Sequence, residues 1–73
     1  MMEQQGTIKW FSCQKGYGFI EPEVGNDEVF VHYTAIDGDG YRKLRHGDLV
    51  VFETKTASKG PQATEVRRIQ KGS

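Results

Sequence analysis

Cysteine is nearly absent from the 73-residue chain, since Cys13 is the only one. A single cysteine excludes an intramolecular disulfide and a cysteine cluster that could hold zinc, and it favours a reducing compartment. No apolar run approaches the roughly 20 residues that a membrane helix needs. The first residues, MMEQQGTIKW, contain no basic-then-apolar leader. We therefore expect a cytoplasmic protein with no membrane partner.

The chain also has no excess of charge of one sign, because 10 basic residues stand against 10 acidic ones. This balance argues against a strongly basic nucleic-acid binder driven by counterion release. The distribution is uneven, however: residues 6–20 contain Lys9 and Lys15 but no acid. The acids that follow fall in one short stretch: Glu21, Glu23, Asp27 and Glu28. We expect a local positive surface, with these acids on a turn that points away from it.

Long uninterrupted segments are missing as well. Nine glycines and two prolines divide the chain, and the longest runs free of both are residues 26–37 and 48–59, which excludes long helices. Between the breaks lie short segments rich in β-branched and aromatic residues, as is typical of strands. These segments are TIKWFSC (7–13), YGFIEP (17–22), EVFVHY (28–33), LVVFETK (49–55) and QATEVRRI (62–69). Five such strands separated by turns predict an all-β fold, a small five-stranded antiparallel β-barrel.

The last segment is the ambiguous one, because Ala63, Val66 and Ile69 also suit one face of a helix. We interpret it as a strand, since an open barrel leaves an edge that needs a partner. Residues 34–47 form a longer connection, with a helical turn expected at TAID. We expect one domain over residues 5–69, with 1–4 and 70–73 as loose termini.

Two segments, KGYGFI and VFVHY, alternate aromatic residues with small or aliphatic ones. Side chains in a strand point alternately to opposite faces, so Tyr17 and Phe19 share one face, as do Phe30 and His32. By alternation alone the aromatic face could equally be the core, because large rings usually dominate cores.

Three observations favour an exposed aromatic face. A histidine such as His32 is mostly not fully buried, the aliphatic face suits a tight barrel interior, and a barrel of this size lacks room for all the rings. The expected core residues are Ile8, Ile20, Val29, Val31, Ile36, Val50, Phe52 and Val66, with Leu44 anchoring the long connection. Exposed rings mark a binding site. Rings with a few positive charges suit an unpaired nucleic-acid strand, because bases stack on rings while lysines meet phosphates. We expect Gly16 and Gly18 to let the backbone and bases approach closely.

The same segments carry a resemblance to a known family. KGYGFI and VFVHY resemble the two ribonucleoprotein motifs of the cold-shock domain family, and the resemblance extends to GTIKWF, AIDGDGY and KGPQA, in the family's order. It covers about residues 5–69 and implies an oligonucleotide-binding (OB) fold that binds single-stranded RNA and DNA on its first three strands. An RNA-recognition-motif domain is excluded, because residues 1–14 cannot hold the strand, helix and strand that precede the motif there.

The resemblance also implies which residues bind. Stacking or edge contacts would come from Trp10, Phe11, Tyr17, Phe19, Phe30, His32, Tyr33 and Tyr41. Lys9, Lys15 and Lys59 match positions used for backbone or polar contacts. If these three lysines are the main phosphate contacts, the logarithmic salt slope of affinity is about −2, from roughly 0.7 per phosphate on single strands.

Several residues keep a plainer interpretation beside the functional one. Trp10 could plug the barrel end, and the basic residues Arg42, Lys43 and Arg45 either extend the phosphate path or form a solvated loop. Arg67 and Arg68 are expected to be solvated. Family members commonly differ from this chain at three further positions, where base contacts would change: Ser12, Cys13 and Glu28.

Catalysis is disfavoured because neither His32 nor His46 has a carboxylate or cysteine at ligand spacing, and Cys13 has no activating neighbour. The leading prediction is an RNA- and DNA-binding module that keeps RNA unstructured without ATP. The resemblance implies support of transcription and translation, also in a cold-shock response. We expect a monomer with no cofactor, metal or small-molecule substrate. The alternative is an aromatic groove that docks a protein, such as a proline-rich peptide; an enzyme is a third and weaker alternative.

Overall fold

The structure of the protein is a computed structural model, and it describes residues 3–25, 27–36 and 43–70. Five strands make up most of this part of the chain. They are β1 (Gln4–Ser12), β2 (Tyr17–Pro22), β3 (Val29–His32), β4 (Leu49–Ala57) and β5 (Gly60–Gln70), with a 3-10 turn, η1 (Tyr33–Ala35), after β3. Each predicted strand is confirmed, including the ambiguous last one. The helical turn expected at TAID begins one residue earlier, and β1 and β5 extend one residue beyond the predicted domain. No helix among the described residues is long and apolar enough to cross a membrane.

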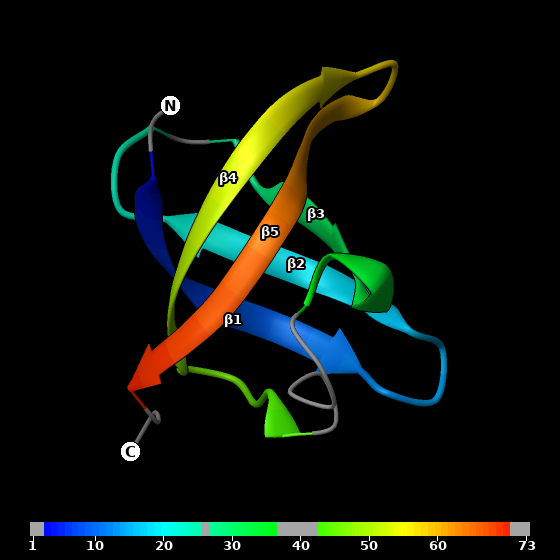
Figure 1. Ribbon diagram of the computed structural model, residues 1–73, viewed down its shortest axis with the longest axis vertical. Coiled ribbons are helices and arrows are strands. Elements are labelled where there is room, and N and C mark those ends of the chain that lie inside the picture. Colours follow the sequence, from blue (N-terminus) through cyan, green and yellow to red (C-terminus); the bar gives the residue numbers. More distant parts are fainter. Residues whose placement is uncertain (1–2, 26, 37–42, 71–73) are drawn as a thin grey trace.

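The strands close into a barrel in the order β1-β2-β3-β5-β4, which confirms the predicted fold class. Figure 1 shows β4 and β5 crossing in front of the sheet formed by β1, β2 and β3. Neighbouring strands are antiparallel except β3 and β5, which run parallel where Phe30 faces Gln62. Strand directions cannot alternate all the way around a ring with an odd number of members. One parallel contact is therefore a necessity of closing five strands.

The barrel interior is aliphatic. The buried cluster contains every predicted core residue: Ile8, Ile20, Val29, Val31, Ile36, Val50, Phe52 and Val66, together with Leu44 and Ala63. Among the described residues, Phe52 is the only aromatic ring in this buried set. The prediction that the aliphatic face is the core is therefore confirmed, and the other rings of the described residues lie outside the buried set.

A bulge in β1 decides which of its side chains face outward. Ile8 pairs with Ile20 and Trp10 pairs with Phe19, so Lys9 is an extra residue with no partner in β2. One extra residue reverses the alternation of every later side chain in the strand. Lys9 and Trp10 are consequently both exposed, and Phe11 packs against the buried cluster.

The bulge is bonded to the segment that leads into β4. The backbone of Ile8 donates to the Asp48 carbonyl (2.9 Å) and accepts from the Gly47 N–H (2.8 Å). The Lys9 carbonyl accepts a hydrogen bond from His46 Nδ1 at 2.7 Å. Residues 46–48, which directly precede β4, therefore supply hydrogen-bond partners to the part of β1 where its pairing with β2 shifts.

Asp48 is a buried carboxylate in this segment, only 2% exposed. It accepts a hydrogen bond from the Arg45 backbone N–H (2.9 Å), and its Oδ2 lies 3.5 Å from Arg68 Nη1. Arg68 also donates to the Lys43 carbonyl (3.1 Å). The expectation of a freely solvated Arg68 is wrong, because this side chain ties the start of β4 to β5. Arg67 is exposed, as predicted, with Nη2 at 3.7 Å from Glu3.

Gly18 has a role in the packing of β2 against β1. A Cβ atom on this buried residue would lie 2.2 Å from the Trp10 carbonyl oxygen and 2.7 Å from Phe11 Cα. Strand β1 could not pass so close if residue 18 had a side chain. The expected close backbone approach at Gly18 is therefore confirmed, with a stricter packing requirement than the sequence indicated, and the approach of bases stays a prediction.

Gly16 is also buried and has a φ of +83°, in the left-handed region that favours glycine. Its carbonyl accepts from the Tyr33 N–H (2.9 Å), and a Cβ here would lie 2.9 Å from the Tyr33 ring. The β1–β2 turn thus needs glycine for its backbone and for contact with Tyr33.

Candidate functional site

Four aromatic rings from three strands form one continuous group on the outer face of the barrel. We call Trp10, Tyr17, Phe19 and Phe30 the ring cluster. Trp10 lies 5.8 Å from Tyr17 and 5.6 Å from Phe19 between ring centroids, and Phe30 lies 5.8 Å from Tyr17 and 5.7 Å from Phe19. Each ring therefore contacts two others, and none of the four is isolated.

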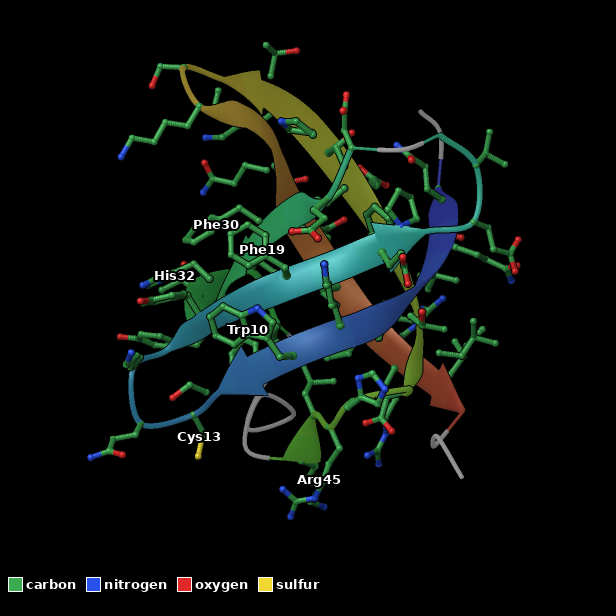
Figure 2. All side chains as sticks on the ribbon, turned by 180° about the vertical axis from the view of Figure 1, so that it is seen from behind. Trp10, Cys13, Phe19, Phe30, His32 and Arg45 are labelled. Carbon is green, nitrogen blue, oxygen red and sulfur yellow. The ribbon has the colours of Figure 1, made fainter. Side chains whose placement is uncertain are left out.

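Strand pairing brings these rings together. Phe19 lies opposite Phe30 across β2 and β3, and opposite Trp10 across β2 and β1. Figure 2 shows Trp10, Phe19 and Phe30 on one side of the β1–β3 sheet, with His32 beyond them. Trp10 reaches this face only because of the bulge at Lys9, since regular alternation after the buried Ile8 would turn it inward.

The ring cluster is open to solvent. Trp10 is 39% exposed, and the other three rings are half-buried. A contiguous patch of exposed rings is unusual on a monomeric surface and indicates a binding face. The rings offer planar apolar surfaces of the kind on which flat ligands stack.

His32 and Tyr33 extend this face as a second pair, with ring centroids 4.7 Å apart and planes at 35°. His32 Nδ1 accepts from the Thr34 N–H (3.4 Å) and lies 2.9 Å from Thr34 Oγ1, so the side chain caps η1. In the neutral imidazole the proton then lies on Nε2. His32 is oriented by this cap, and the ring is half-exposed beside Tyr33.

Two further aromatic residues were expected at the site. Phe11 packs against the buried cluster, since the bulge turns it toward the interior. Tyr41 lies outside the described residues.

A groove continues the face beyond Phe19 and Phe30. It has a volume of about 410 Å³ and lies between these two rings and the hairpin that joins β4 to β5, residues 57–62. Lys59 is exposed at the tip of this hairpin and lines the groove. The neighbouring residues Pro61 and Gln62 also line it and were not predicted from the sequence, because they belong to a strand distant from the ring motifs.

The three predicted lysines differ in their surroundings. Lys15 lies on the β1–β2 turn and Lys59 on the β4–β5 hairpin; both are exposed, and no acidic partner is found for either among the described residues. Lys9 forms an ion pair and hydrogen bond with Glu28. This hydrogen bond, together with the charge of Glu28, raises the pKa of Lys9 above its ordinary value. The expectation that the acidic stretch points away from the positive surface is therefore wrong for Glu28.

The β1–β2 turn contains two of the positions at which family members commonly differ. Ser12 Oγ accepts a hydrogen bond from the Lys15 N–H (3.2 Å), so it orders the turn. Cys13, the first residue after β1, is exposed, as Figure 2 shows. Among the described residues, no three His, Cys, Asp or Glu side chains gather in a group that could hold a metal ion.

A closed five-stranded barrel with exposed rings on its first three strands and a hairpin groove beside them defines an OB-fold protein. Comparison of the sequence with known proteins agrees with this fold class and identifies one family within it. The family model described as "'Cold-shock' DNA-binding domain" matches residues 4–69. The chain therefore belongs to the cold-shock domain family, a family of proteins that bind single-stranded nucleic acids.

Bacterial relatives match almost end to end. The chain is 57% identical over 65 residues to "Probable cold shock protein A" of Mycolicibacterium smegmatis, covering 89% of this chain and 97% of that protein. It is 53% identical over 66 residues to "Cold shock protein CspD" of Bacillus subtilis, covering 90% and 98%.

Among solved structures, "drosophila Unr CSD456" superposes with a TM-score of 0.77 at 24% identity. The match covers 93% of this chain and 27% of that one. This likeness supports the fold.

Proposed function

We propose that the outer face of β1, β2 and β3 binds single-stranded RNA and DNA by stacking bases on its rings. The observation that carries the proposal is the ring cluster, in which neighbouring centroids lie 5.6–5.8 Å apart on one exposed face. Each base stacked on an aromatic side chain contributes roughly 1–3 kcal/mol. The proposed stacking residues are Trp10, Tyr17, Phe19, Phe30, His32 and Tyr33, with Tyr41 joining from the long connection and Phe11 supporting the edge from below.

Positive charge lies at both ends of the proposed path. Lys15 sits on the β1–β2 turn beside the ring cluster, and Lys59 lines the groove at the other side of Phe19 and Phe30. Lys15 and Lys59 are the proposed contacts to phosphate. Lys9, which is paired with Glu28, is a proposed contact to polar groups of the bound strand. A few cations next to stacking rings are the usual means by which OB folds hold unpaired strands.

A face that binds only unpaired strands can act as an RNA chaperone. Bases in a duplex already stack on each other, so only unpaired ones can use the rings. Binding about six exposed bases at a time shifts a hairpin toward its open form by mass action, with no need for ATP. In the cytoplasm this activity would support transcription and translation through structured RNA, including in a cold-shock response, as membership of the family suggests. The protein acts as a monomeric binding module of residues 5–69, and not as an enzyme.

The test of this function is the opening of an RNA hairpin that carries a fluorophore and a quencher. Near the melting midpoint of the hairpin, we expect the protein to increase fluorescence without ATP. Phe30→Ala should reduce this effect strongly, whereas Val24→Ala should not, since Val24 is 85% exposed on the β2–β3 turn and outside the ring cluster. If the protein binds a single strand yet leaves the hairpin closed, it is a binder without chaperone activity.

A further inference from the structure

Lys9 is the one lysine of the proposed binding face whose described surroundings include an acidic partner. Its ammonium group is paired with the Glu28 carboxylate, although both side chains are solvent-accessible, at 47% and 41% exposure. Glu21 adds a second, weaker negative influence on Lys9. Lys9 therefore lies near two carboxylates, whereas no acidic partner is described for Lys15 or Lys59.

The fold holds this pair across the middle strand of the face. Lys9 is the bulge residue of β1, and Glu28 stands immediately before β3, with β2 between them. The two residues are 19 positions apart in the sequence. The backbone of Lys9 is fixed by the hydrogen bond from His46 to its carbonyl, so its side chain starts from a defined point next to Trp10.

A phosphate that approached Lys9 would have to displace a carboxylate that is already bound. It would also be placed beside the freed Glu28 charge, which repels it. When Lys9 exchanges the Glu28 carboxylate for a phosphate, the binding free energy improves little. A lysine without an acidic partner that binds a phosphate releases a condensed counterion, which favours binding. Lys15 and Lys59 have no described competitor of this kind.

We propose that Glu28 withholds Lys9 from phosphates. The backbone of the bound nucleic-acid strand then passes Lys15 and Lys59 and avoids the beginning of β3, next to Glu28. This inference rests on the proposed function. It adds the path that the nucleic-acid backbone takes across the same face and the lysines that its phosphates contact. In the complex, Lys9 and Glu28 remain an ion pair with no net charge.

The test is a set of salt titrations of affinity for a labelled oligothymidine, made with four proteins: wild type, Glu28→Gln, Lys9→Gln and the double variant. With two phosphate contacts, the wild-type logarithmic slope should be about −1.4, at about 0.7 per contact. Lys9→Gln should leave this slope unchanged. Glu28→Gln frees Lys9 and should steepen the slope to about −2.1, and the double variant should return it to about −1.4.

At low salt, Glu28→Gln should also bind oligothymidine about twofold to fivefold more tightly. This range corresponds to the small free energy of one exposed ion pair, which a phosphate no longer has to break to reach Lys9. The matched control is Glu65→Gln, which removes the same charge from an exposed site on β5. It should change neither the slope nor the affinity beyond a small uniform amount. Thermal unfolding of each variant verifies that the proteins compared are folded.

Two results would overturn the inference while leaving the function intact. A slope that becomes shallower in Lys9→Gln and does not change in Glu28→Gln would mean that Lys9 already contacts phosphate. Weaker binding by both Glu28→Gln and Glu28→Ala would mean that Glu28 itself contacts the bases. By contrast, no binding of the wild type to any single strand would contradict the proposed function, and this inference with it.

Discussion

Phe30 is the residue at which binding and folding separate most clearly. Its ring lies between Tyr17 and Phe19 on the outer face, and its backbone pairs within β3. We expect Phe30→Ala to lose about 1–3 kcal/mol of single-strand affinity, because one stacking surface disappears. Equilibrium binding of a labelled oligothymidine measures this loss.

Folding should change little in the same variant, since the Phe30 ring is outside the buried cluster. Phe52→Ala is the matched comparison, because this ring is 1% exposed and fills the interior. Removing a buried phenylalanine costs about 3–5 kcal/mol, as much as a domain of this size has to lose. If Phe30→Ala were the variant that unfolds, the assignment of the outer face would be wrong.

Gly18 gives a prediction of the opposite kind, in which stability falls although no contact is removed. A methyl group on residue 18 would meet backbone atoms of Trp10 and Phe11, which cannot move without shifting β1. We expect Gly18→Ala to destabilise the protein by about 1–3 kcal/mol or more, as overpacking of a core does. Urea unfolding measures the change, and an unaltered midpoint would contradict the close β1–β2 approach.

Among the elements, β2 and β3 could be predicted from the sequence, but the bulge in β1 could not. The motifs around Tyr17 and Phe30 alternate without interruption, and their strands pair in a regular register. In β1 the bulge at Lys9 reverses the alternation. Its hydrogen-bond partners lie in residues 46–48, far along the chain. No local pattern could signal a bulge whose partners are so remote.

His46 is the side chain that bonds directly to the bulge residue, Lys9. Since a carbonyl can only accept, His46 Nδ1 must donate to the Lys9 oxygen. A hydrogen bond of this kind contributes about 0.5–1.5 kcal/mol. We expect His46→Ala to shift the fluorescence maximum of Trp10 and to weaken single-strand binding by about twofold to fivefold, at the lower end of that range because the site is exposed.

Two further variants make this prediction specific. His46→Gln keeps a side-chain N–H donor and should recover part of the affinity. Arg45→Ala changes the preceding exposed residue, whose described contact to Asp48 uses only its backbone. It should behave as wild type in Trp10 fluorescence. An unchanged Trp10 spectrum in His46→Ala would mean that the bulge holds its shape without the histidine.

For the whole molecule, the number of strands and their closure followed from the sequence, while charge pairing did not. Short segments divided by glycine and proline indicated five strands, and the need to pair an open edge identified β5. The ion pair between Lys9 and Glu28 joins residues from either side of β2. Such a pair exists only once the barrel has formed, so counting charges along the chain could not place Glu28 next to Lys9.

The barrel as a whole separates two tasks between the faces of one sheet. The inner face of β1, β2 and β3 supplies much of the aliphatic core, and the outer face holds the ring cluster. A small domain of this kind has little stability to spare, yet it leaves several large rings partly exposed. Binding at this face gives those exposed rings a function.

The single tryptophan allows the central claim to be tested directly, because Trp10 belongs to the ring cluster. The measurement is a titration of Trp10 fluorescence with a short oligothymidine, its uridine counterpart and a matched duplex, at two salt concentrations. We predict quenching by both single strands and not by the duplex, with a mild weakening at the higher salt. No response to either single strand, confirmed with a labelled oligonucleotide, would contradict the account and favour a face that docks a peptide.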